Sequence, residues 1–176
     1  MRLTALLLSS LLLTATLPAL AANDLQVGFS PALNGPSALE VVTQGIDSAH
    51  HQVLVAAYSF TSKPIATALV AAKKRGVDVQ VVADEKANSG KYSAVTFLAN
   101  QGVPVRLNGR YAIMHNKFMV IDGQAVETGS FNYTQAAAEH NAENALLLHN
   151  VPDLARAYTQ DFQKLWSEGQ PLSPRY

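Results

Sequence analysis

The sequence predicts a single α/β domain in which a mixed, mostly parallel sheet is covered by helices on both faces. Residues 53–58 form a continuous apolar run, which is typical of a strand that is buried on both faces, and residues 77–83 are interpreted as another buried strand. Stretches with helical spacing of apolar residues alternate with these strands, which favours helices packed on a central sheet. The chain has 176 residues, of which 48% are hydrophobic, and this is sufficient for one domain with its own core.

The first half of the chain is expected to alternate strands with helices. The expected elements are a strand at 25–29, a helix opened by Pro36-Ser37, a strand at 53–58, a helix at 65–74 and a strand at 77–83. Residues 25–29 alternate as a half-buried strand does, and Ser30-Pro31 ends that run. Ser62 and Pro64 supply the cap and early proline that commonly open a helix, and Gly76 closes it.

The second half contains shorter elements. We expect a helix at 94–100, a short edge strand at 103–106, a hairpin around Asp122-Gly123, a helix at 134–139, a strand at 143–149 and a last helix from Pro152. The edge position at 103–106 follows from Pro104, which cannot donate to a neighbouring strand. The tail after Gly169 contains two prolines and is expected to lack regular structure.

The first 22 residues are interpreted as a secretory signal peptide. A positive residue, Arg2, precedes an apolar run at 3–17, which is too short for a membrane span, and small residues around Ala21 follow. Cleavage would leave one domain at 23–176 without a membrane anchor, in the periplasm or outside the cell. The alternative is an uncleaved anchor. The sequence has no cysteine, so the exported domain must be stable without disulfides.

Composition does not point to a polyanionic partner. Thirteen basic residues balance thirteen acidic ones, and removal of Arg2 with the signal peptide would leave twelve against thirteen. Attraction by overall charge is therefore excluded, and any binding of phosphate must depend on local placement of side chains.

The most informative stretch runs from His115 to Asn132. His115 and Lys117 stand two residues apart ahead of an apolar run, so as strand residues they share one face. Asp122-Gly123 then predicts a hairpin turn, and the returning segment ends in Ser130 and Asn132, again two apart. The hairpin would bring an imidazole, an ammonium, a hydroxyl and an amide together, and these groups can hold and attack a phosphoryl centre.

This spacing resembles the HxKx4Dx6GSxN signature of the phospholipase D superfamily. His115, Lys117, Asp122, Gly129-Ser130 and Asn132 match it position by position. The short chain with one motif copy is most similar to the small bacterial periplasmic endonucleases of that superfamily. The resemblance implies a phospholipase D-like fold and chemistry without a metal or another cofactor.

The resemblance also assigns roles to the candidate residues. His115 is the expected nucleophile, and Glu143, in the run Asn141–Leu146, is the expected acceptor that fixes its tautomer. Lys117 and Asn132 are expected to hold the phosphate oxygens, with Ser130 assisting. A lone histidine on a strand is more often structural, and the alternative for Glu143 is that it merely begins a strand.

Asp122 has two explanations. It is the aspartate of the motif, which places it among the catalytic candidates. Its position before Gly123 also explains it as a turn residue without a catalytic role.

A single motif copy raises a question of stoichiometry, because the leaving oxygen needs a second group to protonate it. In relatives with two motifs a second histidine does this. The resemblance therefore implies a homodimer that brings two copies of His115 to one cleft.

Other polar residues offer weaker candidates. His50-His51 could suggest a metal site, but adjacent histidines on a strand point to opposite sides. His140 could line the cleft or be an exposed loop residue, and Arg106 and Arg110 could hold neighbouring phosphates or be surface charges.

The function expected from the sequence is that of a sequence-nonspecific, metal-independent endonuclease that cleaves DNA through a phosphohistidine intermediate. RNA is left open as a further substrate. A second hypothesis keeps the chemistry and changes the substrate to phospholipid, as a phospholipase D or phosphatidyl transferase. A third is a nucleic-acid-binding module without turnover.

Overall fold

The computed structural model describes residues 24–90 and 93–175. The predicted signal peptide, residues 1–22, lies outside the described residues. Among those that are described, no helix combines the length and apolar character needed to cross a bilayer.

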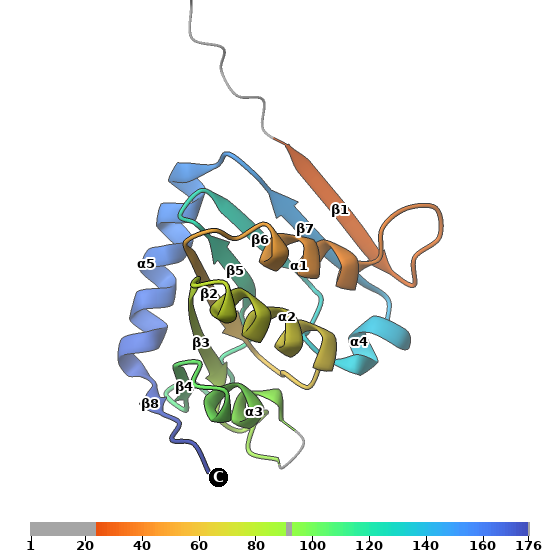
Figure 1. Cartoon of the computed structure of the whole chain (residues 1–176). Helices are drawn as coiled ribbons and strands as arrows, with labels where there is room; N and C mark the ends of the chain where they lie inside the picture. The colour runs from red at the N-terminus through yellow and green to blue at the C-terminus, as the bar shows by residue number, and fades with distance from the viewer. Residues whose placement is uncertain (1–23, 91–92, 176) are drawn as a thin grey trace, which may run out of the picture.

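One eight-stranded sheet organises the described chain (Figure 1), with strand order β1-β7-β6-β5-β2-β3-β4-β8. The elements are β1 (Leu25–Ser30), α1 (Ala38–Asp47), β2 (Gln52–Ala57), α2 (Lys63–Lys74), β3 (Asp78–Asp84), α3 (Ala94–Asn100), β4 (Val105–Asn108), β5 (Lys117–Ile121), β6 (Ala125–Gly129), α4 (Gln135–Glu139), β7 (Glu143–Leu148), α5 (Pro152–Glu168) and β8 (Gln170–Pro171).

The single α/β domain with a mixed sheet is confirmed, but the prediction that the sheet is mostly parallel was wrong. Within the described residues, β2–β3 and β3–β4 are parallel, and the other five neighbouring pairs are antiparallel. A buried apolar run reports burial on both faces, which either strand direction allows. The β5–β6 hairpin has a short connection, residues 122–124, which requires antiparallel pairing. β6 and β7 also pair antiparallel, although residues 130–142, which include α4, lie between them.

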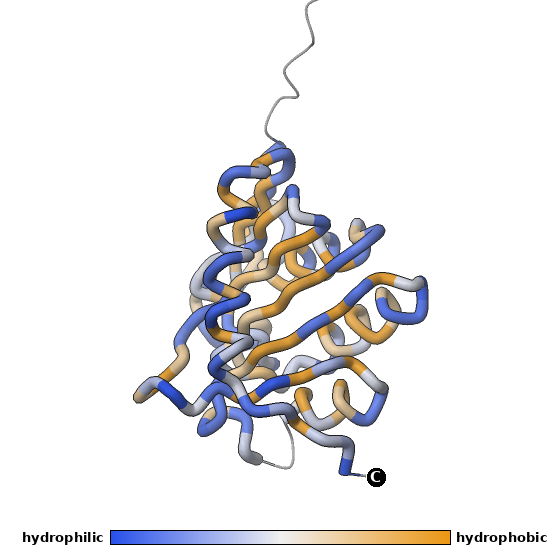
Figure 2. The backbone as a smooth tube through the Cα atoms, turned by 90° about the vertical axis from the view of Figure 1, so that its left-hand side faces the viewer, coloured by the Kyte–Doolittle hydropathy of each residue, from blue (hydrophilic) through white to orange (hydrophobic). Residues whose placement is uncertain are grey.

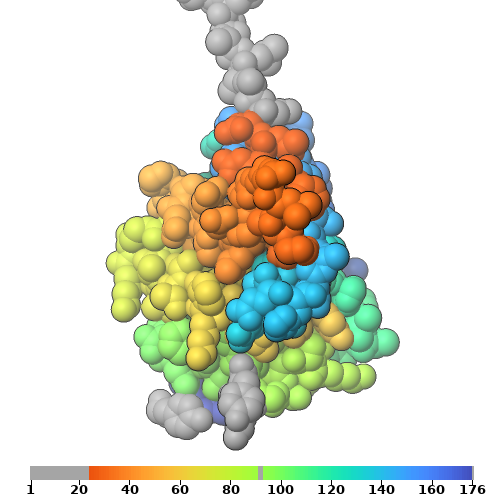
Figure 3. Space-filling view, turned by 90° about the vertical axis from the view of Figure 1, so that its right-hand side faces the viewer, coloured from red at the N-terminus to blue at the C-terminus, as the bar shows by residue number. Residues whose placement is uncertain are grey.

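Helices cover both faces of the sheet, as predicted. α1, α2 and α3 lie on one face and α5 lies on the other, and Figure 2 shows the sheet between them. Alternate residues of the buried strands supply both cores: Val53 and Val55 belong to the core under α1 and α2, whereas Leu54 and Ala56 belong to the core under α5. The short α4, cyan in Figure 3, lies beside α2 and the chain around β1.

The helix starts follow the capping residues of the sequence. Ser37 forms a capping box with Glu40, and the Ser62 hydroxyl accepts a hydrogen bond from the Ile65 amide at the start of α2. The hairpin turn also forms as predicted. Asp122 and Gly123 have φ of 52° and 65°, the positive values that a type I′ turn requires.

The predictions for 103–106 and for the tail were wrong in part. Pro104 precedes β4, so its missing N–H costs no hydrogen bond within the strand. β4 is not an edge strand, because β8 pairs with it through Arg106 and Leu107. The Arg106 guanidinium donates to the carbonyl oxygens of Trp166 and Gly169 and stacks on the Trp166 ring, which ties the tail to the sheet.

Glu127 of β6 is a buried carboxyl group, 1% exposed, that accepts a hydrogen bond from the Tyr133 hydroxyl at 2.7 Å. Burial raises its pKa from 4.5 to about 8, although the Tyr133 hydroxyl acts in the opposite direction. The folded protein therefore keeps this proton between pH 5 and 8, where the unfolded chain has lost it.

We expect the Glu127 carboxyl to make the protein less stable as the pH rises through this window. The contribution approaches about 1.4 kcal/mol per pH unit, because the unfolded state binds fewer protons than the folded state. Glu127→Gln should remove this component, so that the variant gains stability relative to wild type from pH 5 to 8 in urea titrations. Glu139→Gln, at the exposed end of α4, is the control. A parallel pH dependence of wild type and Glu127→Gln would contradict the prediction.

Candidate active site

Five of the six predicted site residues line one hollow at the end of the sheet where β5 begins and β6 ends. Residues from β5, β6, β7 and α5 contribute to it. The lining comprises His115, Asn116, Lys117, Phe118, Thr128, Gly129, Ser130, Asn132, Glu143 and Tyr158.

Gly129 explains how the Gly-Ser step of the motif shapes the hollow. A Cβ atom at this position would lie 2.2 Å from the carbonyl oxygen of Asn144, so only glycine lets β6 approach β7 this closely. The amides of Ser130 and Phe131 then donate to that carbonyl oxygen at 3.1 and 3.2 Å. This contact turns the Ser130 side chain towards Glu143.

Ser130 and Glu143 form one hydrogen-bonded unit. The Ser130 hydroxyl donates to Glu143 Oε2 at 2.6 Å and accepts from the Asn144 amide at 3.1 Å. Asn141 Nδ2 donates to the other carboxylate oxygen at 3.0 Å. In the described part of a single chain, the hydrogen-bond partners of Glu143 are thus Ser130 and Asn141, and not His115.

Lys117 is a buried cation beside the imidazole. The residue is 9% exposed, and its Nζ donates to the His115 carbonyl oxygen at 2.8 Å. Burial lowers the pKa of the ammonium, and the negative charge of Glu143 partly opposes that shift. Nζ also lies 5.3 Å from the centre of the Tyr58 ring. A positive charge is therefore held in a partly desolvated place, where it stabilises a phosphate oxygen more than it would in water.

His115 itself is exposed and packs against an aromatic ring. Its imidazole lies 4.6 Å from the Tyr58 ring, at an angle of 59°. Tyr58 directly follows β2 and reaches the site because Ala57 pairs with Lys117. The sequence interpretation missed Tyr58, which it treated as the end of a buried strand, and also missed Tyr158 of α5. A tyrosine at the end of a strand was the available signal for Tyr58, but it does not reveal which strand lies alongside.

Asn132 carries an unused acceptor. Its Oδ1 is buried and has no hydrogen-bond partner among the described residues. Buried polar atoms without a hydrogen-bond partner are rare in folded proteins, because leaving the hydrogen bond unmade is costly. A substrate or a second chain that donates a hydrogen bond would satisfy this atom.

Asp122 lies apart from the other candidates. It follows the far end of β5, roughly 16 Å along the strand from Lys117. Its carboxylate accepts hydrogen bonds from the amides of His50, His51 and Gln52 at 2.8–2.9 Å. Burial raises its pKa, but these three donors and His51 lower it more, so the net shift is downward. The geometry favours the structural explanation: Asp122 fastens the hairpin turn to the start of β2.

Asp122→Ala is expected to cost about 2–3 kcal/mol of stability, since three amides lose a charged acceptor and Ala fits positive φ less well. The loss should shrink in acid, because a carboxylate with a lowered pKa stabilises the fold above its unfolded pKa and stops doing so as the pH falls. Turnover per folded molecule should stay within about threefold. Chemical unfolding and activity measured on the same sample test this. A large loss of turnover with unchanged stability would return Asp122 to the catalytic group.

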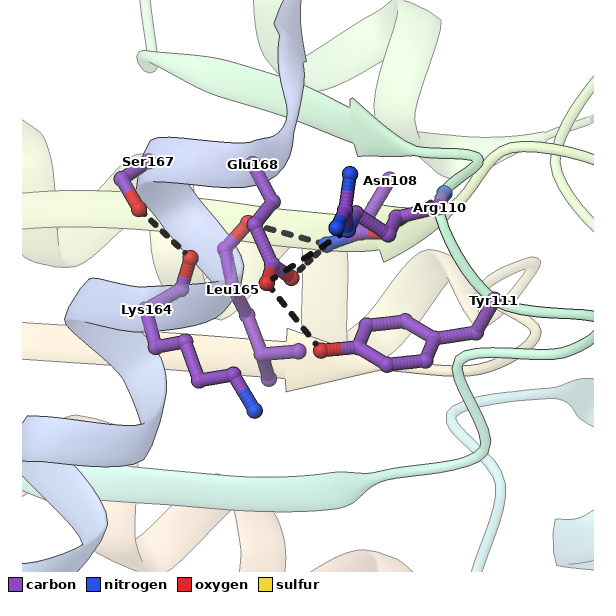
Figure 4. A network of polar contacts seen from close by, with 7 residues as sticks. All are labelled: Asn108, Arg110, Tyr111, Lys164, Leu165, Ser167 and Glu168. Carbon is purple, nitrogen blue, oxygen red and sulfur yellow. Dashed lines mark hydrogen bonds and ion pairs between the residues drawn. The ribbon is translucent and has the colours of Figure 1, made fainter.

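The weaker candidates lie outside the hollow. The Arg106 guanidinium is engaged with the end of α5, and Arg110 lies 4.0 Å from Glu168 (Figure 4). His140 is exposed beside Glu139, and His50 lines a different hollow together with Asp122. Within residues 24–90 and 93–175, no group of three or more His, Cys, Asp or Glu side chains is arranged to hold a metal ion.

A sequence profile described as "Cardiolipin synthase, PLD-like domain" matches residues 42–166. The chain is 31% identical over 147 residues to a phospholipase D of Rickettsia typhi, covering 84% of this chain and 70% of that protein. It is 36% identical over 116 residues to the mitochondrial cardiolipin hydrolase of Xenopus tropicalis, covering 66% of this chain and 55% of that protein.

Solved structures share the fold. The crystal structure of Nuc, a phospholipase D family member from Salmonella typhimurium, is 43% identical and superposes with a TM-score of 0.81, covering 86% of this chain and 99% of that one. NucT from Helicobacter pylori is 24% identical with a TM-score of 0.71, covering 85% and 99%. The latter identity supports the fold alone.

Proposed function

Since the chain belongs to the phospholipase D superfamily, we propose that this phosphodiesterase is a metal-independent endonuclease that hydrolyses DNA without sequence specificity. The observation that carries the proposal is the shared hollow, where the imidazole of His115, the buried ammonium of Lys117 and the side-chain amide of Asn132 lie together. RNA contains the same diester and is the second substrate to test. The proposal includes export, so that the domain at 23–176 acts in the periplasm or outside the cell.

In the proposed reaction, an imidazole nitrogen of His115 attacks the phosphorus. A P–N bond forms and the P–O bond to one nucleoside breaks. Lys117 and the amide of Asn132 hold the non-bridging oxygens, whose negative charge grows as the bond forms. Glu143 has lone pairs left after its bonds to Ser130 and Asn141, and one of them accepts the imidazole N–H and fixes the tautomer. Water then cleaves the P–N bond and returns His115 to its starting form.

One chain supplies only half of the proton chemistry. The leaving oxygen needs an acid, and the attacking water later needs a base. The hollow contains one histidine. We therefore propose a homodimer with two-fold symmetry in which His115 of a second copy serves as this acid and base. Two-fold symmetry would place the two imidazoles on either side of one phosphate.

The sheet offers a surface for that second copy. Leu25, Val27 and Phe29 of β1 lie opposite Leu148, Leu146 and Asn144 of β7, on the face that carries α5. α5 packs mainly against β2 to β6, so the outer part of this face stays open. We call the residues Leu25, Val27, Phe29, Leu146 and Leu148 the outer strip.

The outer strip is apolar and adjoins the candidate site. Its β1 members are 57%, 40% and 55% exposed. Leu146 pairs with Thr128 and Phe29 pairs with Asn144, and these two partners border the hollow and hydrogen-bond Ser130, respectively. A second copy seated on the outer strip would therefore also meet the mouth of the hollow. Contiguous exposed apolar surface of this kind commonly marks an interface.

A phospholipid is the second candidate substrate, because curated relatives bear the names phospholipase D and cardiolipin hydrolase. Sequence identity favours the nuclease. The chain is 43% identical to Salmonella Nuc, against 31% to the Rickettsia protein and 36% to the Xenopus protein.

Parallel assays distinguish the substrates. Purified protein is incubated with plasmid DNA, with RNA and with vesicles of phosphatidylcholine and cardiolipin, each with and without EDTA. We expect nicking and degradation of DNA in the presence of EDTA. Release of a lipid headgroup without DNA cleavage would support the phospholipase. Tight DNA binding without turnover, and no phosphoprotein after acid quenching, would support the binding module.

A further inference from the structure

Two buried polar side chains lie outside the motif, where β3 ends and the chain turns towards α3. Asp84 is 2% exposed and Asn88 is 3% exposed. Buried carboxylate and amide groups are costly unless their hydrogen bonds are made. The partners of these two groups are informative, because Met114 directly precedes His115 and the ring of Tyr58 contacts the His115 imidazole.

Asp84 anchors the backbone directly before the catalytic candidate. Its Oδ2 accepts from the Met114 amide at 2.7 Å, and its Oδ1 accepts from the Ala87 amide at 2.7 Å. Residues 109–116 form no helix or strand, so the position of His115 depends on such anchors. The other end of this loop is fastened to α5: Tyr111 donates to Glu168, and Asn108 donates to the Leu165 carbonyl oxygen (Figure 4).

Asn88 holds the aromatic neighbour of the imidazole. Its Nδ2 donates to the Tyr58 carbonyl oxygen at 2.6 Å and to the Asp84 carbonyl oxygen at 2.8 Å. Its Oδ1 accepts from the Phe60 amide and from the Ser93 hydroxyl, both at 3.0 Å. All four hydrogen bonds of the amide are thus made. The backbone on either side of residue 59 is fixed to the turn that also carries Asp84.

We propose that Asp84 and Asn88 are positioning residues for His115. Asp84 fixes the loop that carries the imidazole, and Asn88 fixes the Tyr58 ring against which the imidazole packs. Their direct bond makes the two anchors one unit. The inference rests on the proposed function in so far as His115 is the nucleophile, and it adds two residues that the motif does not include.

The test compares Asp84→Asn with Asp78→Asn at the opposite, exposed end of the same strand. Asparagine turns one acceptor oxygen into a donor and so opposes the Met114 or Ala87 amide. With bis(p-nitrophenyl) phosphate, we expect kcat to fall about 10- to 100-fold for Asp84→Asn, with KM within about threefold, because misplacement by about 1 Å has effects of this size. Asp78→Asn should change neither constant more than twofold.

Histidine titration by NMR gives a readout that does not depend on activity. The chain has five histidines, so His50, His51, His140 and His149 are internal controls. We expect the chemical shift of His115 alone to change in Asp84→Asn. Asn88→Asp keeps an oxygen that can accept from the Phe60 amide and the Ser93 hydroxyl, but it loses the N–H donors to the Tyr58 and Asp84 carbonyl oxygens. It should change the same resonance and also lower kcat. It replaces Asp84→Asn if that variant does not fold.

The results of these measurements distinguish the positioning role of Asp84 and Asn88 from the proposed nuclease function. An unchanged His115 resonance and unchanged kcat in folded variants would overturn the positioning role. A wild-type protein that cleaves no phosphodiester would overturn the proposed function, and the NMR titration would still decide whether Asp84 and Asn88 position the imidazole. A fall in melting temperature with kcat intact below it would reduce both residues to stabilisers of the fold.

Discussion

Replacement of His115 with alanine is expected to lower kcat/KM on DNA by about 10⁴-fold or more, because loss of a covalent nucleophile has effects of this size. The side chain is exposed and its structural contacts are few, so the fold should be unaffected. Plasmid nicking followed over hours, together with circular dichroism and sedimentation, measures both properties. His140→Ala, which removes another exposed imidazole outside the hollow, is the control and should retain full activity.

The same variant tests how the two copies share the reaction. Wild-type and His115→Ala chains are mixed in equal amounts, unfolded and refolded together, so that a quarter of the dimers keep two imidazoles. Activity close to one quarter supports a site that needs both. Activity close to one half would mean that each chain works alone, and undiminished activity of the pure variant would contradict the assignment of the nucleophile.

Placing a charge on the outer strip should have the second large effect. Phe29→Asp puts a carboxylate on the strip, and two-fold symmetry puts two of them into one interface. Burying unpaired charge is costly, so we expect dissociation at micromolar concentration and a loss of nuclease activity of at least about 100-fold. The residue is 55% exposed in the single chain, so the monomer should still fold. Sedimentation equilibrium and plasmid nicking measure both effects.

Phe97→Asp is the matched control, because Phe97 is 44% exposed on α3, on the opposite side of the sheet. It should leave assembly and activity unchanged. A dimeric and active Phe29→Asp would show that the second copy sits elsewhere. A monomeric and fully active Phe29→Asp would instead refute the shared site.

The local features were predictable because their causes are local. The Asp122-Gly123 turn needs positive φ at consecutive residues, and the period of two then determines which side chains share a face. The hollow that contains His115, Lys117, Ser130, Asn132 and Glu143 follows from that hairpin and from its pairing with β7.

The features that were not predictable depend on contacts between distant segments. The prediction of mostly parallel strands was wrong because the burial of a strand's side chains does not depend on the direction of the strand. Tyr58 enters the site only through the pairing of β2 with β5, about sixty residues further along the chain. From the sequence, Arg106 could be a surface charge or a phosphate ligand, but its guanidinium donates to a carbonyl oxygen at the end of α5. Asp84 and Asn88 were also not predictable, since each forms hydrogen bonds with the backbone of residues that are distant in the sequence.

The fastening of the His115 loop to α5 has a consequence for the order in which the site forms. Glu168 and the Leu165 carbonyl oxygen belong to the last helix, so they are synthesised well after His115. A chain still emerging from the ribosome already holds the complete motif and Asp84, but it lacks the anchors on α5. The loop that carries His115 therefore takes its final position only after α5 has been synthesised.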